Sequence, residues 1–360
     1  MSGSRRLRSA SLATALVLAA TLAGTARAGG GGFSFDVLLN DTCVSGTGPA
    51  DTGLAISLRT FSGHLRDRFR TTTDGDGNWV GCFRLGVRGG NVIKALGGGS
   101  SESWRIPKIT LDTERVSDVV SGLGPENTTL ALTVVHYPGF ASGREISVAE
   151  REVTTDGDGD YSTDFSDAVA IVGGDQVSAL LQQDGNRATI VNLAPRMGIF
   201  RNDDVAFGNL NPGDPVHVEL RRADGSLKAQ LTSPGFFSNF WDGILYAPDG
   251  TSVAARPGDV LWSDIASDSR FTLPVMALNG SATRDTVYGR CMPNRPYEVI
   301  VVRESLTEFV FESFRGRTNG AGRFVKEVSA RVDLQRGDRL TLECKFATGD
   351  LVGRLNSAGG

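Results

Sequence analysis

The sequence predicts an all-β protein built from four tandem β-sandwich units that follow a signal peptide. Short stretches that alternate apolar and polar residues recur along the chain, whereas the apolar periodicity of helices is scarce. Glycine supplies 46 of the 360 residues, which suits a chain rich in turns. The same order of turn and strand residues also occurs four times, and such repetition indicates copies of one module.

The first 28 residues have the features of a secretory signal peptide. Basic residues stand at 5–8, an apolar run covers 12–22, and the small-residue ending Ala26-Arg27-Ala28 offers a cleavage site. Ser4-Arg5-Arg6 also allows a twin-arginine route, but the residues after the arginine pair fit that motif poorly and favour general secretion. We therefore expect a secreted protein, extracellular or periplasmic.

The remaining chain is acidic. Cleavage after residue 28 would remove four of the 37 Lys and Arg and none of the 41 Asp and Glu. The chain that remains has 33 basic and 41 acidic side chains and a net charge of −8. This balance does not favour nucleic acid or an anionic membrane as a partner. No other segment approaches the roughly 20 apolar residues of a membrane helix, so we expect no membrane insertion.

A glycine followed by a proline opens the repeated pattern. The proline stands three or four residues after the glycine, and an alternating strand begins eight residues after the same glycine. The four glycines are Gly46, Gly122, Gly208 and Gly289, and the strands are expected at 54–58, 130–134, 216–220 and 297–301. Alternation gives each strand one buried face, which a second sheet must cover.

An Asp-Gly or Asn-Gly turn before an aromatic residue is the second repeated element. It occurs at 73–79, 155–161 and 318–324, with a degenerate version at 232–240. Such turns supply the positive φ angles of a tight hairpin, and the aromatic side chain is expected to return to the core. A Gly-Asx pair then opens another strand in each unit: Gly90-Asn91, Gly174-Asp175, Gly258-Asp259 and Gly337-Asp338.

Proline-led extended segments separate the units. They lie at 107–111, 195–199 and 274–278, and they predict edge or linker strands because proline cannot donate to a sheet ladder. Residues 33–35 hold the matching place in the first unit, without the proline. The expected units are 29–104, 105–192, 193–271 and 272–351, followed by a flexible tail over 352–360.

The four cysteines are expected to form two disulfides in an oxidising compartment. Three pairings are possible, and closeness in sequence favours Cys43 with Cys82 and Cys291 with Cys344. Each bond would then close a loop in one terminal unit and contribute roughly 3 to 4 kcal/mol. A cysteine metal site is excluded because no two cysteines are close in sequence and only three histidines exist.

The order of these elements resembles a known group of modules. Val-x-Gly, proline, an alternating strand, the turn that ends in Trp79 and the Gly-Asx pair are similar to the tandem immunoglobulin-like and carboxypeptidase-regulatory-like (transthyretin-type) β-sandwiches of exported bacterial proteins. The resemblance covers nearly all of residues 33–350. It implies spacers, stalks and adhesive or ligand-binding modules, and it brings no catalytic residues.

Calcium is the strongest chemical candidate. Six oxygen-bearing residues fall at positions 1, 3, 5, 7, 9 and 12 of a loop like that of an EF-hand. They are Asp156, Asp158, Asp160, Ser162, Asp164 and Asp167. However, Tyr161 stands where glycine should make the bend, and no helices flank the loop. We favour a purely structural turn, with a weak calcium site as the alternative and no other cofactor.

No catalytic residues are predicted. His64, His136 and His217 fall in three different units, without a serine or cysteine nucleophile at a recognisable spacing. No Gly-x-Ser-x-Gly elbow occurs either. An acid/base pair among the many carboxylates is neither excluded nor located by the sequence.

Three tryptophans fall outside the clear alternating strands: Trp104, Trp241 and Trp262. Exposed aromatic residues on sandwich loops can stack on sugars or anchor a protein, so Trp241 and Trp104 are the candidate ligand-binding residues. The alternative, which we favour, is that they fill the junctions between units or the core of the third unit.

Together these features predict a non-enzymatic exported protein of structural, adhesion or ligand-binding type, shaped as a short rod of four sandwiches. Its expected partner is a protein or polysaccharide at the cell exterior. The alternative is a carbohydrate-binding protein, or the accessory region of an extracellular hydrolase, with the surroundings of Trp241 as the contact.

Overall fold

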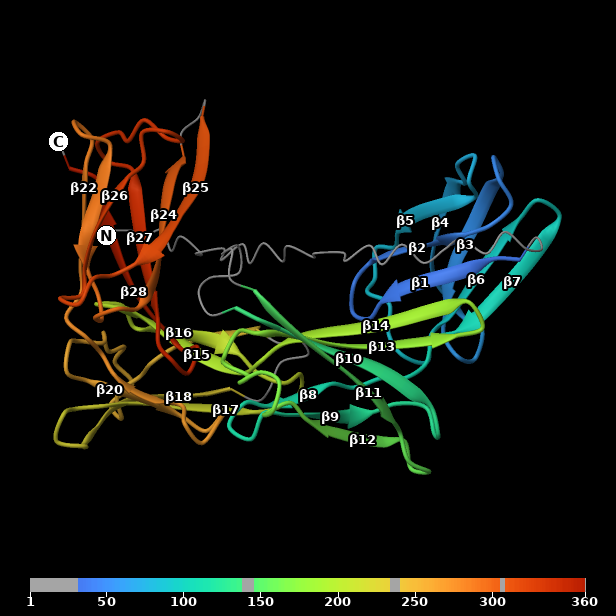
Figure 1. The fold of residues 1–360 in the computed structure, drawn as a ribbon, viewed down its shortest axis with the longest axis horizontal. Helices are drawn as coiled ribbons and strands as arrows, with labels where there is room; N and C mark the ends of the chain where they lie inside the picture. The colour runs from blue at the N-terminus through green and yellow to red at the C-terminus, as the bar shows by residue number, and fades with distance from the viewer. Residues whose placement is uncertain (1–31, 138–145, 234–239, 305–307, 360) are drawn as a thin grey trace.

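The only regular secondary structure among the described residues, apart from turns, is the β-strand. This computed structural model describes residues 32–137, 146–233, 240–304 and 308–359, and within them it has 28 strands and no α-helix (Figure 1). The predicted all-β fold is confirmed. The expected signal peptide, residues 1–28, lies outside the described residues. In the described part of the chain no helix has the length and hydropathy of a membrane span.

Seven consecutive strands form each of four units, numbered 1 to 4 along the chain. Unit 1 comprises β1 (Ser34–Leu38), β2 (Cys43–Thr47), β3 (Gly53–Arg59), β4 (Leu65–Thr72), β5 (Asn78–Cys82), β6 (Val92–Gly97) and β7 (Ser100–Arg105). Unit 2 comprises β8 (Asp112–Glu114), β9 (Val119–Leu123), β10 (Thr129–His136), β11 (Ser147–Thr154), β12 (Asp160–Asp164), β13 (Gln176–Gln183) and β14 (Asn186–Leu193).

The second half of the chain repeats this arrangement. Unit 3 comprises β15 (Arg196–Arg201), β16 (Val205–Asn209), β17 (Val216–Arg221), β18 (Leu227–Ser233), β19 (Phe240–Ile244), β20 (Val260–Ser263) and β21 (Arg270–Thr272). Unit 4 comprises β22 (Ala277–Ser281), β23 (Thr286–Arg290), β24 (Pro296–Glu304), β25 (Phe309–Arg317), β26 (Arg323–Glu327), β27 (Arg339–Lys345) and β28 (Leu351–Ser357).

Two sheets face each other in every unit. The first, second and fifth strands form one sheet, and the other four form the second sheet, as in the order β4-β3-β6-β7 of unit 1. The alternating strands predicted from the sequence explain the packing: Leu54, Ile56 and Leu58 of β3 are at most 2% exposed, and the residues between them face outward. The four sandwiches are thus the expected solution for strands with one apolar face.

The units are joined in pairs by shared sheets. The first strand of unit 1, β1, pairs in parallel with β14, the last strand of unit 2, so that one seven-stranded sheet crosses both units. β15 of unit 3 pairs in parallel with β28 of unit 4 in the same way. β15 is therefore the strand that enters unit 3, as one of the two alternatives expected, but it is an inner strand and not an edge strand. Pro195 allows this because it precedes β15, so every residue of the strand can donate to the ladder.

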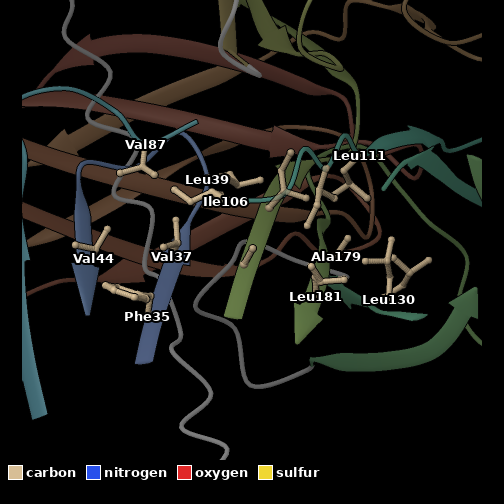
Figure 2. Packing of buried hydrophobic residues seen from close by; sticks show 14 of the residues in the cluster. Phe35, Val37, Leu39, Val44, Val87, Ile106, Leu111, Leu130, Ala179 and Leu181 are labelled. Carbon is tan, nitrogen blue, oxygen red and sulfur yellow. The ribbon is translucent and has the colours of Figure 1, made fainter. Parts of the chain in front are cut away.

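The hydrophobic core follows this pairing. One cluster of buried residues runs through units 1 and 2, and it brings Phe35 and Val37 of β1 into the same core as Leu130 and Leu181 of unit 2 (Figure 2). A second cluster runs through units 3 and 4. Sharing a core helps modules of about 80 residues, which bury only a little over 60% of their extended surface when alone.

The Asp-Gly turns do not close hairpins, which corrects the expectation for these segments. β4 pairs with β3 in one sheet, whereas β5 pairs with β2 in the other, so the turn between β4 and β5 carries the chain across the sandwich. The same crossing separates β11 from β12 and β25 from β26. The positive φ falls on the second glycine of each turn, as at Gly77 and Gly159. The aromatic residues do return to the core, since Trp79 and Tyr161 are each 4% exposed.

The end of the chain is ordered as a strand rather than as the expected tail. Residues 352–357 belong to β28, which lies between β27 and β15. Gly353 allows close packing rather than flexibility, because a Cβ at this position would approach the Phe200 ring to 2.3 Å. The sequence-based boundaries at 104, 192 and 271 fall in the last two or three residues of β7, β14 and β21.

The four units do not form a simple rod. In Figure 1, units 1 and 4 rise on the same side of the molecule, while units 2 and 3 form its base. Unit 4 folds back so that its residues contact unit 2 as well as unit 3, for example where Thr348 accepts the N–H of Gly173 at 2.8 Å. The expectation of an end-to-end rod is wrong because the β15–β28 pairing places unit 4 beside unit 3.

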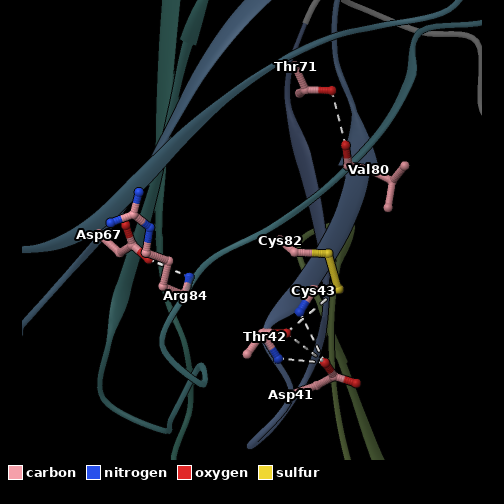
Figure 3. Close-up of a disulfide and its surroundings, with 8 residues drawn as sticks. All are labelled: Asp41, Thr42, Cys43, Asp67, Thr71, Val80, Cys82 and Arg84. Atoms are coloured by element: carbon pink, nitrogen blue, oxygen red, sulfur yellow. Dashed lines mark hydrogen bonds between the residues drawn. A yellow bond between two sulfur atoms is a disulfide. The ribbon is translucent and has the colours of Figure 1, made fainter. Parts of the chain in front are cut away.

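Both cysteine pairs favoured by the sequence are joined. Cys43 and Cys82 face each other on β2 and β5, within one sheet (Figure 3). Cys291 follows β23 and Cys344 lies in β27, so their bond connects the two sheets of unit 4. Cys43 is exposed, whereas Cys291 and Cys344 are buried.

Candidate functional site

The acidic turn of unit 2 does not gather calcium ligands. Asp156 uses its Oδ1 to accept the backbone N–H groups of Asp158 and Asp160, each at 2.9 Å, which forms a closed turn. Asp160 to Asp164 then lie along β12, where alternate side chains stand roughly 7 Å apart and cannot converge. Asp164 accepts the N–H of Ser166, and Asp167 pairs with Arg151. Across the described residues, no three His, Cys, Asp or Glu side chains form a group able to hold a metal ion.

The His136–Asp175 contact is the arrangement closest to a catalytic pair. His136 Nδ1 lies 2.8 Å from Asp175 Oδ2, and the Asp175 side chain is fully buried. Asp175 also accepts the N–H groups of Tyr137 and Val172. Its oxygens are therefore used by the surrounding backbone, as expected for a structural carboxylate.

The other three units contain the same arrangement without histidine. In every unit the Gly-Asx pair lies at a turn in which the glycine has positive φ. The Asx side chain accepts the backbone N–H of the residue three positions earlier, and it also accepts a hydrogen bond from a side chain on another strand. The donors from the other strand are Arg66 to Asn91, His136 to Asp175, Lys228 to Asp259 and Arg303 to Asp338. Because the role is repeated with four different pairs, it belongs to the module and not to a reaction.

Trp241 and Trp104 lie within and against the cores, whereas Trp262 is half-buried beside the His217 ring on the other face of β20. Trp241 is 1% exposed and occupies in β19 the place that Trp79 has in β5, so it lies in the core of the third unit, the favoured alternative, and not on a loop that contacts sugar. Trp104 in β7 is half-buried and stacks on Phe35 with ring centroids 6.4 Å apart. Part of the aromatic cluster, residues 234–239, lies outside the described residues.

A buried arginine joins three units. Arg115 follows β8 in unit 2, and its side chain is 1% exposed. Its guanidinium donates to both oxygens of Asp350 in unit 4, at 3.0 and 3.2 Å, and to Asp268 in unit 3 at 2.9 Å. It also donates to the Ser269 hydroxyl and to the Pro195 carbonyl. Such a planar, many-donor group suits a junction of several chain segments.

Asp350 is fully satisfied at this junction. Besides Arg115 it accepts the Met197 N–H at 2.9 Å and the Thr348 hydroxyl at 2.8 Å. Burial of an ion pair is tolerated when the remaining lone pairs are hydrogen-bonded in this way. The pairing was missed at the sequence level because Arg115 and Asp350 are 235 residues apart and belong to no repeated motif.

Further ionisable groups lie where unit 4 meets units 2 and 3. Lys345 Nζ donates to the Tyr137 carbonyl at 2.6 Å, and burial lowers the pKa of this lysine to about 8. Burial and the Glu298 carboxylate on the neighbouring strand raise the pKa of Glu343 to about 7, while Arg196 opposes that rise. Lys345 thus belongs to the contact between units 4 and 2, whereas Glu343 interacts with Arg196 of unit 3.

A hollow of about 240 Å³ lies where unit 3 meets the end of unit 2. Its lining includes Pro195, Leu210, Asn211, Asp214 and Asp264. Asn211 accepts the Thr113 N–H and Asp264 accepts the His217 N–H, so part of this polar lining already holds the backbone. The hollow is smaller than most ligand pockets, which measure roughly 300 to 1,000 Å³.

Comparison with known proteins finds solved structures that are similar only at low sequence identity and low TM-score. No protein-family model matches the chain, and no curated protein matches it. It is similar to a tetra-tandem repeat in the extending region of a large adhesion protein, with 14% identity over 91% of this chain and 100% of that one and a TM-score of 0.18.

Two further solved structures are comparably similar. The BSP domain of a biofilm-associated protein is 9% identical over 91% of this chain and 96% of that one, with a TM-score of 0.18. Native alpha-2-macroglobulin from E. coli is 10% identical over 91% of this chain and 28% of that one, with a TM-score of 0.18. At these TM-scores the likeness assigns no activity, ligand or partner, so the functional argument depends on the chain's own residues.

Proposed function

We propose that the chain is a non-enzymatic exported structural protein of the adhesion or ligand-binding type, whose four sandwiches act as one rigid support for loops and sheet edges. One observation carries this proposal: two seven-stranded sheets each cross a pair of units, and the buried Arg115–Asp350 pair joins the two halves. A continuous ladder and a buried ion pair both resist bending between modules.

The use of the polar residues supports a structural role. The buried Asx side chains hold turns in all four units, and the His136–Asp175 pair is one member of that set. The two disulfides suit an oxidising compartment outside the cytoplasm. The proposed partner is a protein or a polysaccharide at the cell exterior.

Solution X-ray scattering tests the rigid support. We expect the curve of the purified protein to match the curve calculated from a single arrangement of the four units. An Arg115→Met variant that keeps its far-UV circular dichroism should give a larger radius of gyration, because the two halves then lose their buried link. A native curve that requires many arrangements would contradict the proposal.

Binding is tested separately with labelled protein and the envelope of the cells that export it. A structural protein of adhesion type should bind saturably and release on competition with unlabelled protein. A heat-unfolded sample is the control. Binding that does not saturate, or that the unfolded sample reproduces, would argue against an adhesive role.

A further inference from the structure

The outward face of one sheet in unit 1 carries positive charge and no acidic residue. The sheet has the order β4-β3-β6-β7, and its inner face packs on the core. Five cationic side chains alternate along these strands with inward-facing residues and therefore lie on the outward face. They are Arg59 on β3, Arg68 and Arg70 on β4, Lys94 on β6 and Arg105 on β7. We call this surface the basic face of unit 1.

The strand registers spread the five cations over a flat surface. Arg68 and Lys94 both pair with Ser57, so they lie on either side of it, and Arg59 and Arg105 belong to the next row of the same face. Next-but-one strands are about 10 Å apart, and alternate residues of one strand are about 7 Å apart. The charges are therefore spaced for a partner that extends across the sheet and not for a single small ion.

No carboxylate of the described residues forms an ion pair with any of these five cations. Arg59 donates to the Gly63 carbonyl at 2.9 Å, and the Arg105 guanidinium lies 4.0 Å from the centre of the Phe61 ring. Both partners belong to the turn between β3 and β4, which holds the two arginines without neutralising them. The other three cations are exposed.

The corresponding sheets of the other units are not basic in this way. Unit 2 has Glu150 and Glu152 on β11 at the places that Arg68 and Arg70 have on β4. In units 3 and 4 arginines of this face form ion pairs with glutamates of the same face: Arg221 with Glu219, and Arg315 with Glu298. The module therefore does not require a basic face, and the charge is particular to unit 1.

Protection of a sheet edge explains only part of this charge. Charged side chains on an edge strand discourage pairing with another chain, and Arg68 and Arg70 on β4 can serve that purpose. However, Arg59 and Lys94 lie on β3 and β6, which have a neighbouring strand on both sides. Their charges protect no edge, so the basic face as a whole indicates a negatively charged partner.

The chemistry of the face fits an acidic polysaccharide. A guanidinium group binds a carboxylate through two parallel N–H bonds. The positions beside the cations include Ser57, Ser101 and Ser103, whose hydroxyl groups can bond to those of a sugar. Within these four strands the aromatic side chains, Phe69 and Trp104, pack against the core and not outward. The face therefore has no platform for stacking nucleobases and no aromatic anchor for a protein.

We infer that the basic face of unit 1 binds a polysaccharide that carries carboxylate groups on its repeating sugars. The inference rests on the proposed function, because it names the class of one partner at the cell exterior. The sheet lies at one end of the molecule, away from units 3 and 4 (Figure 1), so an extended polymer can cross it. Binding should weaken as the salt concentration rises, since salt screens exposed charges.

Titration calorimetry of the purified protein with polygalacturonate at low salt tests the inference. We expect saturable binding to this polymer and none to dextran, which is neutral. Arg68→Gln/Arg70→Gln should weaken the binding about tenfold, the loss expected for two exposed charge pairs. Unchanged thermal unfolding shows that this variant is folded. Failure of the native protein to bind, or an unchanged affinity of the variant, overturns the inference.

A matched variant separates the basic face from the total charge of the protein. Arg290→Gln/Arg323→Gln also removes two positive charges, from exposed positions that lie opposite each other on β23 and β26 of unit 4. It should bind polygalacturonate like the native protein. A loss equal to that of Arg68→Gln/Arg70→Gln would show that binding depends on net charge alone, and it would overturn the assignment to unit 1.

Two other anionic ligands test the class of partner. Phosphatidylglycerol vesicles and duplex DNA present phosphates instead of carboxylates. Weaker binding to both than to polygalacturonate, at equal anionic charge, supports the inference, and tighter binding to either overturns it. The envelope experiment distinguishes this inference from the proposed function. Saturable binding to the envelope without binding to polygalacturonate would remove the inference alone, whereas binding to polygalacturonate without saturable binding to the envelope would remove only the adhesive role.

Discussion

Gly46 lies directly opposite Trp79 in the β2–β5 pair, and the indole ring occupies the space that a side chain at position 46 would need. A Cβ at Gly46 would stand 2.0 Å from the Ser34 carbonyl oxygen and 2.8 Å from the ring. The other units show the same relationship, at Gly122 with Tyr161, Gly208 with Trp241 and Gly289 with Phe324. The repeated glycine is therefore the position whose missing side chain leaves space for the core aromatic residue.

We expect Gly46→Ala to lower the free energy of unfolding by about 1 to 3 kcal/mol, because the added methyl group must displace backbone or the indole ring. Gly53→Ala is the matched control in the same unit, since nothing lies within 4 Å of a Cβ there. Its unfolding free energy should change by no more than about 0.5 kcal/mol. Urea denaturation measures both variants, and equal losses would contradict the steric explanation.

Removal of either partner of the Arg115–Asp350 pair should be strongly destabilising. Each side chain is 1% exposed, so Arg115→Ala leaves the Asp350 carboxylate buried without a cation at a cost of about 3 to 5 kcal/mol, and Asp350→Ala leaves the buried guanidinium with only the part-exposed Asp268 as its charge partner. The double variant Arg115→Met/Asp350→Leu should lose less than the sum of the two single losses, because neither charge remains. A double-mutant cycle by chemical denaturation measures this coupling, and strictly additive losses would show that the pair is not energetically linked.

Stability should fall as the pH rises through the range in which Glu343 loses its proton. Burial and Glu298 raise the pKa of Glu343 from 4.5 to about 7, so between these values the folded chain keeps a proton that the unfolded chain has released. The folded state is then the one that binds more protons, and raising the pH destabilises it. Glu343→Gln should flatten this slope, whereas the exposed Glu126→Gln should leave it unchanged. Urea denaturation of the native protein and of both variants at several pH values measures how steeply the unfolding free energy changes with pH. Equal slopes in all three proteins would contradict the role of Glu343.

The two disulfides should differ in their response to mild reductant. Access to the sulfur atoms controls the rate of thiol–disulfide exchange. Cys43 is exposed at the sheet surface, whereas Cys291 and Cys344 are buried between sheets. We expect Cys43 and Cys82 to be alkylated first when the reductant concentration is raised stepwise, as peptide mass spectrometry would show. Simultaneous opening of both bonds in the folded protein would contradict this order.

Local sequence patterns predicted the modules well because turns and alternation act over a few residues. The offset from Gly46 to the strand at Leu54, the return of Trp79 to the core and the cysteine pairing preferred by proximity all agree with the structure. The Asp-Gly turns were misjudged because a hairpin and a crossing between sheets use the same turn residues. Only the partners of the flanking strands distinguish the two.

Long-range relationships were not predictable from one sequence. The β1–β14 ladder and the Arg115–Asp350 pair depend on how whole units lie beside each other, and neither leaves a local pattern. The acidic spacing from Asp156 to Asp167 fits a calcium loop, yet the extended backbone of β12 keeps those carboxylates apart. The sequence left two positions open for Trp241 because its turn is degenerate, and the register opposite Gly208 places it in the core, as the favoured alternative expected.

The parallel β1–β14 ladder also sets the order in which the protein can be completed. β1 is the first described strand to be synthesised, but the Phe35 N–H finds its acceptor on Asn186, 151 residues later. The first strand of unit 1 therefore gains its second neighbouring strand only after the whole of unit 2 has been synthesised. The first strand of unit 3 likewise gains its second neighbour only after the last strand of unit 4 has been synthesised. The smallest fragment with a finished interior is a pair of units, so a protein shortened or extended by single units would leave one strand unmatched.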